Sequence, residues 1–337
     1  MSARHLQGDR VRDLGERGLL ARVRRFCASQ VIGDDGAEIP FAPARSLVVT
    51  TDMSIDGVHF SDRTTTAADA GWRTVAANLS DLAAMGAVPL GITVGLGLPG
   101  DTPVAWVEEL YGGMKACLDP FQTEIVGGDI CRSPVKTLSI TAFGRVEPNR
   151  TIRRSQARVG DAIVVSGSHG LSRGGLELLL NPDIGLNLSQ LDRTTLIRAH
   201  QRPRPRLDVL PVLWEILGET TRIAGMDSSD GLADAVLQIC RESGVGATLD
   251  TILLPRALTQ LVPPEKALDW VLYGGEDFEL VLCLPLPSAM ALVAQLGGEA
   301  AIVGTITQGE TVRIVDPNNP DVDRVLSLEE GFQHFRS

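Results

Sequence analysis

Hydrophobic and polar residues alternate with two different periods along this chain, and the two kinds of segment follow one another repeatedly. Apolar residues spaced three and four apart predict helices over residues 14–28, 72–86, 176–180 and 232–244, and one more after Pro103. Short runs of β-branched and aliphatic residues predict strands. These strands cover residues 46–52, 90–98, 124–126, 138–146, 162–165, 278–284, 301–306 and 312–315. Alternating strands and helices predict an α/β fold.

The length of 337 residues predicts two domains, because it exceeds the size of one average domain. The polar stretch 147–150 lies between two strand-rich regions and marks the boundary. We therefore expect one α/β domain over residues 1–148 and a second over 149–337. Residues 181–195 form a polar loop without a clear period, and the prolines at 203 and 205 keep the basic segment 202–206 extended.

The predicted helix after Trp72 carries a polar pair beside its apolar stripe. Asn78 and Asp81 are three residues apart, so their side chains project from the helix in a similar direction. Asp81 lies among Leu79, Leu82 and other apolar residues, where a carboxylate without a partner would be costly. A cation beside Asp81 would remove that cost.

Acidic residues recur where an apolar run gives way to a glycine or a hydroxyl residue, and side chains at such places converge on sites. Converging carboxylates repel one another unless cations lie between them. Hard oxygen ligands favour Mg²⁺ over zinc, so the pattern predicts magnesium-bound phosphate. The segments are Gly33–Asp35, Thr50–Asp52, Asn78–Asp81, Gly127–Asp129, Asp227–Gly231 and Gly274–Asp277.

Each of these residues also has a purely structural explanation. Asp35 could form a turn, Asp52 and Asp129 could cap loops, and Asp230 could be the N-cap of its helix. His59 could be a packed or solvated histidine. Arg153 and Arg154 could be a solvated linker or a phosphate clamp.

Composition excludes several classes of protein. A net charge of -11 argues against partners such as nucleic acid or membrane surfaces, which attract basic proteins. The apolar segments are too short to cross a membrane, and five cysteines without a Cys-x-x-Cys pair indicate neither disulfides nor zinc, so we expect a cytoplasmic protein. Gly95, Gly97 and Gly100 match Gly-x-Gly-x-x-Gly, but Pro99 intervenes, and the motifs of P-loop proteins, protein kinases and Gly-x-Ser-x-Gly hydrolases are missing.

An ordered series of segments from Gly15 to Phe335 resembles the thiamine-monophosphate kinase family, in the superfamily of aminoimidazole ribonucleotide synthetase. The segments are Ile32–Asp35, Thr50–Met53, Gly57–Phe60, Asn78–Gly86, Val126–Asp129, Arg154–Ser155 before Gly160–Asp161, Ser229–Leu232, Gly274–Leu280 and Gly331–Phe335.

The resemblance implies a two-domain aminoimidazole ribonucleotide synthetase-like α/β fold, in which the N-terminal sheet pairs into a barrel across a homodimer. It assigns metal and nucleotide binding and the dimer interface to the N-terminal domain, and nucleotide and substrate binding to the C-terminal domain. It implies metal ligands at Asp35, Thr50, Thr51, Asp52, Asp81, Asp129, Asp227 and Asp230, nucleotide contacts at Gly128, Asp129, Arg154 and Ser229, and acceptor contacts at His59 and Glu276.

The activity implied by the resemblance is transfer of the γ-phosphoryl group of ATP to thiamine monophosphate with several Mg²⁺ ions. The acceptor is itself a phosphate, so no general base is expected. The chain departs from the family pattern at Ile130, at Ser228 and at Glu329, which stands where some relatives carry an aromatic against the substrate ring and leaves Phe332 as the nearest aromatic candidate. The alternatives are another ATP-using enzyme of the superfamily and a non-catalytic sensor of nucleotide or thiamine phosphate.

Overall fold

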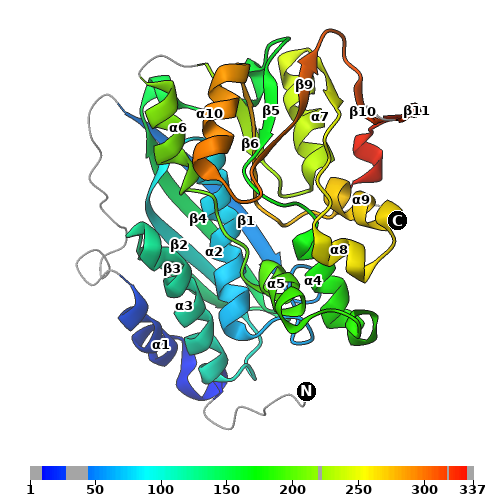
Figure 1. Ribbon diagram of the computed structural model, residues 1–337. Coiled ribbons are helices and arrows are strands. Elements are labelled where there is room, and N and C mark those ends of the chain that lie inside the picture. The colour runs from blue at the N-terminus through cyan, green and yellow to red at the C-terminus, as the bar shows by residue number, and fades with distance from the viewer. Residues whose placement is uncertain (1–9, 28–44, 219–221, 317–318, 332–337) are drawn as a thin grey trace. The chain divides into compact units, whose positions relative to one another are not determined.

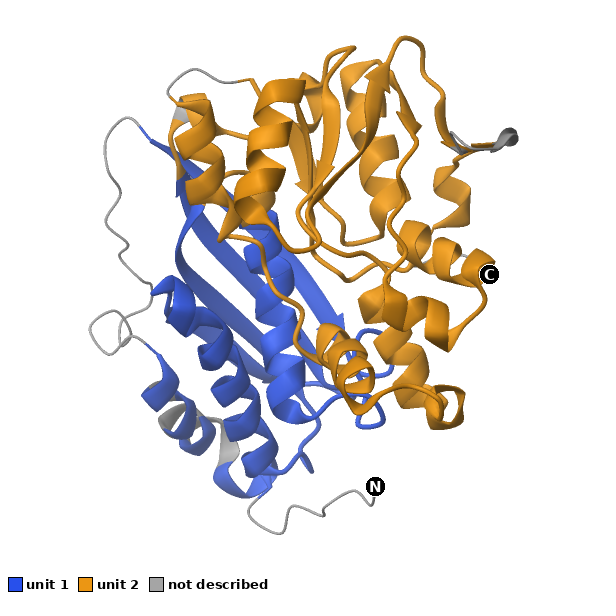
Figure 2. Cartoon of the chain, viewed as in Figure 1, with its two compact units in different colours: residues 1–82, 88–145 blue, residues 83–87, 146–337 orange. Residues whose placement is uncertain are grey.

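The computed structural model describes residues 10–27, 45–218, 222–316 and 319–331. The chain divides into two compact units (Figure 2). Unit 1 comprises residues 1–82 and 88–145, and unit 2 comprises residues 83–87 and 146–337. The division of roles expected between residues 1–148 and 149–337 stays a prediction. No helix among the described residues is long and apolar enough to span a membrane.

Unit 1 contains a four-stranded mixed sheet in the order β1-β4-β2-β3. Strand β2 pairs antiparallel with β4 and parallel with β3. Figure 1 shows helices lying along one face of this sheet. The elements are β1 (Ser46–Ile55), β2 (Val88–Leu98), β3 (Ile125–Arg132), β4 (Thr137–Val146), α1 (Val11–Val23), α2 (Ala67–Ala84) and α3 (Val104–Leu118).

Helix α2 follows the predicted apolar stripe. Val75, Leu79 and Leu82 are fully buried, and Gly86 adopts a φ of 72° just after the helix ends. Glycines let α2 approach α3 closely: a Cβ on Gly71 would lie 2.1 Å from the carbonyl oxygen of Leu110.

Unit 2 contains a seven-stranded sheet in the order β11-β10-β7-β9-β5-β8-β6. All five residues of β8 are buried, because helices α7 and α10 both pack against this strand. The strands are β5 (Ala162–Val165), β6 (Ala224–Asp227), β7 (Gly246–Leu249), β8 (Leu280–Leu284), β9 (Ala301–Thr307), β10 (Val312–Asp316) and β11 (Asn319–Val325). The helices are α4 (Leu171–Leu180), α5 (Gln190–Gln201), α6 (Val209–Leu217), α7 (Leu232–Ser243), α8 (Arg256–Leu261), α9 (Pro264–Tyr273) and α10 (Leu286–Leu296).

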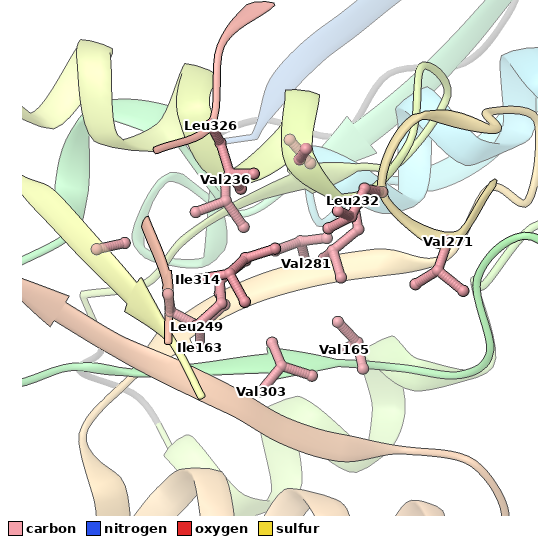
Figure 3. Close-up of a cluster of buried hydrophobic side chains, with 14 of the residues drawn as sticks. Ile163, Val165, Leu232, Val236, Leu249, Val271, Val281, Val303, Ile314 and Leu326 are labelled. Atoms are coloured by element: carbon pink, nitrogen blue, oxygen red, sulfur yellow. The ribbon is translucent and has the colours of Figure 1, made fainter. Parts of the chain in front are cut away.

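One hydrophobic cluster forms the core on the α7 side of this sheet (Figure 3). Leu232 and Val236 of α7 lie over strand residues such as Ile163 and Val281, and all four are almost fully buried. The residues are aliphatic and β-branched, as expected of a sheet whose strands are covered by helices. This core fixes the strand ends from which the loops of unit 2 emerge.

Several predicted elements differ from the structure. Strand β1 continues to Ile55, so Thr50–Asp52 lies within the strand and not at its end, and helix α4 begins at Leu171 and not at residue 176. The expected loop over 181–195 contains the start of helix α5, whose N-cap Ser189 accepts a hydrogen bond from the amide of Asp192. Strand β3 continues through Gly127–Asp129, so these residues lie within a strand and not in a loop after it. Strand β8 begins at Leu280 and not at Phe278, because Phe278 has a φ of 55°, which no strand residue adopts.

Candidate functional site

Two hydrogen bonds join the middle of strand β1 to helix α2 in unit 1. The hydroxyl of Thr50 donates to the carboxylate of Asp81. The backbone amide of Asp52 donates to Oδ1 of Asn78 over 3.2 Å, and Nδ2 of Asn78 donates to the carbonyl of Thr74. Asn78 is fully buried. The prediction that Asn78 and Asp81 project together is therefore confirmed, and both meet the Thr50–Asp52 segment.

Thr51 lies on the other face of β1. Exposure alternates along the strand, and Thr50 and Asp52 belong to its less exposed face. The Thr51 hydroxyl lies 2.7 Å from the hydroxyl of Thr141 on β4. Its side chain therefore points away from Asp81.

Gly128 and Asp129 lie on β3, at the opposite edge of the sheet from β1. Two strands intervene, so β1 and β3 are about 14 Å apart at a strand spacing of about 4.8 Å. Gly128 is required by packing, because a Cβ there would lie 2.1 Å from the carbonyl oxygen of Val94. Within unit 1, Asp129 is thus exposed and separate from the Thr50–Asp81 group.

His59 lies in a tight turn that follows β1. Its Nδ1 accepts a hydrogen bond from the amide of Ile55 at 3.2 Å, so a neutral ring carries its proton on Nε2. Lys136 holds this turn through an ion pair with Asp56 at 3.2 Å, and its ammonium lies 4.9 Å from the centre of the Trp106 ring. The histidine therefore has a fixed main-chain position and a defined hydrogen-bond donor.

In unit 2, two loops that are distant in sequence are joined. The amide of Glu276 donates to the carbonyl of Ser229 over 2.7 Å. Strand β6 pairs with β8 so that Asp227 lies opposite Leu280. Glu276 has a φ of 60°, a left-handed conformation that is uncommon for a residue with a side chain. The structure therefore brings the predicted residues Asp227, Ser229 and Glu276 to one end of the sheet.

The N-cap role that the sequence suggests for Asp230 is not observed, whereas Asp277 caps a different helix. Asp230 is not the N-cap of α7: that position is Gly231, and no side chain caps the helix. Asp277 instead caps α4, because its carboxylate accepts hydrogen bonds from the amides of Gly170 at 2.6 Å and Ser172 at 2.8 Å. Burial raises the pKa of Asp277 to about 7, although the two amides oppose this rise.

Arg154, the predicted nucleotide contact, lies on an exposed 3₁₀ turn (Arg154–Gln156) beside α7. Its guanidinium donates to Oε1 of Gln238, whose Nε2 donates to the carboxylate of Asp234. Burial raises the pKa of Asp234, while the hydrogen bond from Gln238 and the charge of Arg154 lower it. The guanidinium is therefore oriented by α7 and remains at the surface.

A cavity of about 460 Å³ lies beside the Gly274–Asp277 turn. Trp270, Tyr273 and Gly274 line it together with Glu329. The guanidinium of Arg173 lies 6.0 Å from the centre of the Trp270 ring. Glu329, the departure from the family pattern, thus lines a cavity that also contains the charged side chains of Arg173, Asp269, Arg324 and Glu330, and Trp270 is only 7% exposed. Phe332 and Asp35 lie outside the described residues.

Unit 2 also contains functional candidates that the sequence did not indicate. Ser228, the second departure, is fully buried, and its hydroxyl accepts a hydrogen bond from the amide of Glu279 at 3.2 Å. Glu279 forms a buried ion pair with Arg206. The only sequence signal for Arg206 was its place in the arginine–proline segment, which is extended, as predicted, over residues 203–206.

The donor atoms of the predicted ligands suit a hard cation. Thr50, Asp52, Asp81, Asp227 and Asp230 offer only oxygen atoms, as magnesium prefers. Over the part of the chain that the structure describes, no group of three or more His, Cys, Asp or Glu side chains is close enough to hold a metal ion. Of these residues, Thr50, Asp52 and Asp81 belong to unit 1, and Asp227 and Asp230 belong to unit 2.

Comparisons with known proteins agree with this fold. Residues 33–146 match the family of AIR synthase related protein, N-terminal domain, and residues 158–317 match its C-terminal domain. The chain is 49% identical over 325 residues to a thiamine-monophosphate kinase of Synechococcus elongatus, covering 96% of this chain and 97% of the relative. The two-domain fold expected from the sequence is confirmed; its pairing into a barrel stays a prediction.

Solved structures of similar proteins have the same fold. The crystal structure of thiamine-monophosphate kinase from Stenotrophomonas maltophilia K279a superposes with a TM-score of 0.75 at 34% identity, over 88% of this chain and 94% of the other. The structure of AaThiL complexed with AMPPCP and TMP gives a TM-score of 0.69 at 31% identity, over 91% and 96%.

Proposed function

The chain belongs to the thiamine-monophosphate kinase family, and from this premise we propose that it transfers the γ-phosphoryl group of ATP directly to the phosphate of thiamine monophosphate. The observation that carries the proposal is the 49% identity to a thiamine-monophosphate kinase over 96% of the chain. The solved relative complexed with AMPPCP and TMP supports the same pair of substrates. The products are thiamine diphosphate and ADP.

The reaction makes one P–O bond and breaks another. An oxygen of the acceptor phosphate attacks the γ-phosphorus, and the bond from that phosphorus to the bridging oxygen of ADP breaks in line with it. The attacking oxygen is already anionic near neutral pH, so no side chain has to remove a proton. Alignment and charge neutralisation therefore account for the catalysis.

We propose that magnesium ions are held by the oxygen donors of Asp35, Thr50, Thr51, Asp52, Asp81, Asp129, Asp227 and Asp230. When bound, they would neutralise the phosphates that have to approach one another in an acidic protein. The hydrogen bond from Thr50 keeps the Asp81 carboxylate beside β1, and Asn78 fixes the main chain at Asp52. These contacts limit the movement of the ligands before the substrates bind.

The remaining roles concern the substrates. We propose that Gly128, Asp129, Arg154 and Ser229 contact the nucleotide and that His59 and Glu276 contact the acceptor, with Phe332 as a further candidate. His59 would donate from Nε2, since its Nδ1 accepts from Ile55. We propose the cavity lined by Trp270, Tyr273 and Glu329 for the thiamine heterocycles.

A homodimer is also part of the proposal. Leu47, Val49 and Met53 of β1 are each more than half exposed on the sheet face that carries Thr51. A row of exposed apolar side chains on an edge strand is typical of an association surface. A second copy that closed the sheet into a barrel would cover this row and would bring the edge strands of two copies together. A cytoplasmic location stays a prediction.

The test is a product analysis. Purified protein is supplied with ATP and Mg²⁺ and with thiamine monophosphate, free thiamine or no acceptor, and phosphorus NMR identifies the products. We expect a diphosphate ester only from the monophosphate. Transfer to another acceptor would favour a different enzyme of the superfamily, and bound but unconverted thiamine monophosphate would favour a sensor.

Asp81→Asn tests the metal role within the same assay. The amide keeps an acceptor for Thr50 but loses the negative charge, so we expect the melting temperature to change little and turnover to fall by about 10²-fold or more. Asp119→Asn, which removes the same charge from an exposed carboxylate of unit 1 that pairs with Lys115, is the matched control and should keep the turnover of the wild type. Activity like that of the wild type in Asp81→Asn would contradict the role of this carboxylate.

A further inference from the structure

A buried ion pair lies directly behind the two loops of unit 2. Arg206 is only 9% exposed, and its guanidinium donates to the carboxylate of Glu279 and, over 2.7 Å, to the carbonyl oxygen of Ser166. The other side of the guanidinium contacts both carboxylate oxygens of Asp208, at 3.2 and 3.3 Å. Arg206 thus donates from all three nitrogens of its planar guanidinium, which lysine could not do.

Glu279 is tied to the strand ends on both sides. Its carboxylate accepts from the hydroxyl of Ser166, the residue after β5, and that hydroxyl accepts from the amide of Leu280 at 2.8 Å. The space is closed, because a Cβ on Gly167 would lie 2.6 Å from the Glu279 carboxylate. The ion pair therefore links the end of β5 to the start of β8.

The main chain of Glu279 continues this link to the loop after β6. Its amide donates to the hydroxyl of Ser228, and its carbonyl accepts from the amide of Ser228 at 2.9 Å. Ser229 then accepts from the amide of Glu276. One connected set of hydrogen bonds thus runs from Arg206 to the segment carrying Asp227–Asp230 and to the turn carrying Glu276.

Stability alone is a weak reason for such a pair. Burial raises the pKa of Glu279, and the charge of Arg206 only opposes that rise. Removing two charges from water often costs more than their attraction returns, and apolar pairs of similar volume are then equally stable. An ion pair that gives little net stability can still fix geometry, since its hydrogen bonds have preferred directions.

We propose that Arg206 and Glu279 are positioning residues that hold the Asp227–Asp230 loop and the Glu276 turn in their relative places. This inference rests on the proposed function, because those two segments carry proposed metal, nucleotide and acceptor contacts. It assigns to the pair a role in substrate binding and turnover, while neither residue contacts substrate. Disturbing the pair should misplace the loops by a small distance, which is enough to slow a transfer that depends on alignment.

The decisive variant is the double substitution Arg206→Met and Glu279→Met. It replaces the charges with side chains of similar length, so we expect a melting temperature close to that of the wild type. We expect kcat/KM for thiamine monophosphate to fall by about tenfold or more, because the hydrogen bonds that orient the loops are gone. A double variant with both wild-type stability and wild-type kcat/KM would overturn the proposal.

A matched control exists at the other end of the same strands. Arg222 and Asp161 form a two-point ion pair at 2.6 and 2.8 Å, just before β6 and β5 begin. Arg222→Met with Asp161→Met removes a similar pair far along the strands from Ser166 and Ser228. This control should leave kcat/KM for thiamine monophosphate unchanged. An equal loss of kcat/KM in both double variants would also contradict the proposal.

Two further measurements test the proposal if the double variant does not fold or if the wild type is inactive. If the double variant does not fold, Arg206→Lys and Glu279→Gln are measured instead. Each should raise KM or lower kcat in an assay run well below the melting temperature of that variant. If the wild type transfers no phosphoryl group, the proposed function has failed. The positioning role is then tested by calorimetric titration with Mg²⁺ and AMPPCP, and equal affinities for wild type and variant would exclude it.

Discussion

Asp277 shows how one residue of the Gly274–Asp277 turn fastens that turn to another element, helix α4. Its carboxylate accepts two amide hydrogen bonds at the start of α4, and it is almost fully buried. Desolvation raises its pKa to about 7, against the effect of the amides. The folded protein therefore binds a proton at this carboxyl in a pH range in which the unfolded chain has lost it.

This difference predicts a pH-dependent stability with a definite sign. Between the unfolded pKa of about 4 and the folded value near 7, the folded state holds the extra proton, so the free energy of unfolding should fall as pH rises, by at most about 1.4 kcal/mol per pH unit. Asp277→Asn does not titrate. Urea denaturation at several pH values should show the wild type losing stability relative to Asp277→Asn up to pH ~7, with no further relative change above it.

The control for that measurement is built into the comparison. His169 is buried and has its pKa lowered to about 4 by desolvation, so it opposes Asp277 in part of the same range. Because His169 is present in both proteins, its effect cancels in the difference. Two stability curves that run parallel from pH ~4 to ~8 would contradict the raised pKa of Asp277.

Single residues were predictable from the sequence where the signal was local. Asn78 and Asp81 could be paired because both lie on one helix, whose period places them on the same side. Asp277, Arg206 and Glu279 could not, because each acts on a segment at least 70 residues away in the chain. Such contacts depend on how the strands are ordered in the sheet, which a single sequence does not reveal.

At the scale of elements, the crossing of α2 and α3 determines where Asp81 lies. A Cβ on Gly113 of α3 would lie 1.9 Å from the carbonyl oxygen of Ala68 on α2, whereas its neighbour Gly112 has nothing within 4 Å of such an atom. The helices therefore pack backbone to backbone at Gly113. Helix α2 also carries the proposed ligand Asp81 and its neighbour Asn78, so its distance from α3 affects the site.

The two neighbouring glycines give a paired prediction. Gly113→Ala should force the helices apart and lower the free energy of unfolding by about 1–3 kcal/mol. Gly112→Ala should raise it by up to about 1 kcal/mol, since alanine favours the helix and meets no neighbour. Thermal unfolding followed by circular dichroism measures both. Equal melting temperatures for the two variants would show that α2 and α3 can separate without cost.

Elements with strong local signals agree with the structure, and the errors have physical reasons. Gly86 and Gly244 end α2 and α7 as predicted, because both adopt left-handed conformations. Helix α5 was missed because its apolar residues are few, although Ser189 and Asp192 form a recognisable capping pair. Strand β3 runs on through Gly128 because the glycine lets it lie close to β2, and this depends on tertiary contact.

At the scale of the whole molecule, one face of unit 1 remains to be explained. Leu47, Val49 and Met53 expose more than half of their surface along one edge strand, next to the Thr51–Thr141 contact. A monomer would gain nothing by leaving such a row in water. The proposed homodimer would cover this row. It would also place a second copy beside Asp129, which is exposed at the other edge of the sheet.

Val49→Glu tests this surface, because a charge in the centre of the row would be buried against the second copy without a partner. We expect the wild type to be a dimer by light scattering coupled to size exclusion and the variant to be a monomer. Since Val49 is 54% exposed, folding of each chain should be unaffected, and its circular dichroism should match the wild type.

Leu191→Glu on α5, where leucine is 76% exposed, is the matched control and should remain a dimer. A wild type that is monomeric at micromolar concentration, or a Val49→Glu variant that still dimerises, would contradict an interface on this face. If the dimer also completes the metal site through Asp129, kcat of the monomeric Val49→Glu variant should be low at every protein concentration, whereas kcat of Leu191→Glu should equal that of the wild type.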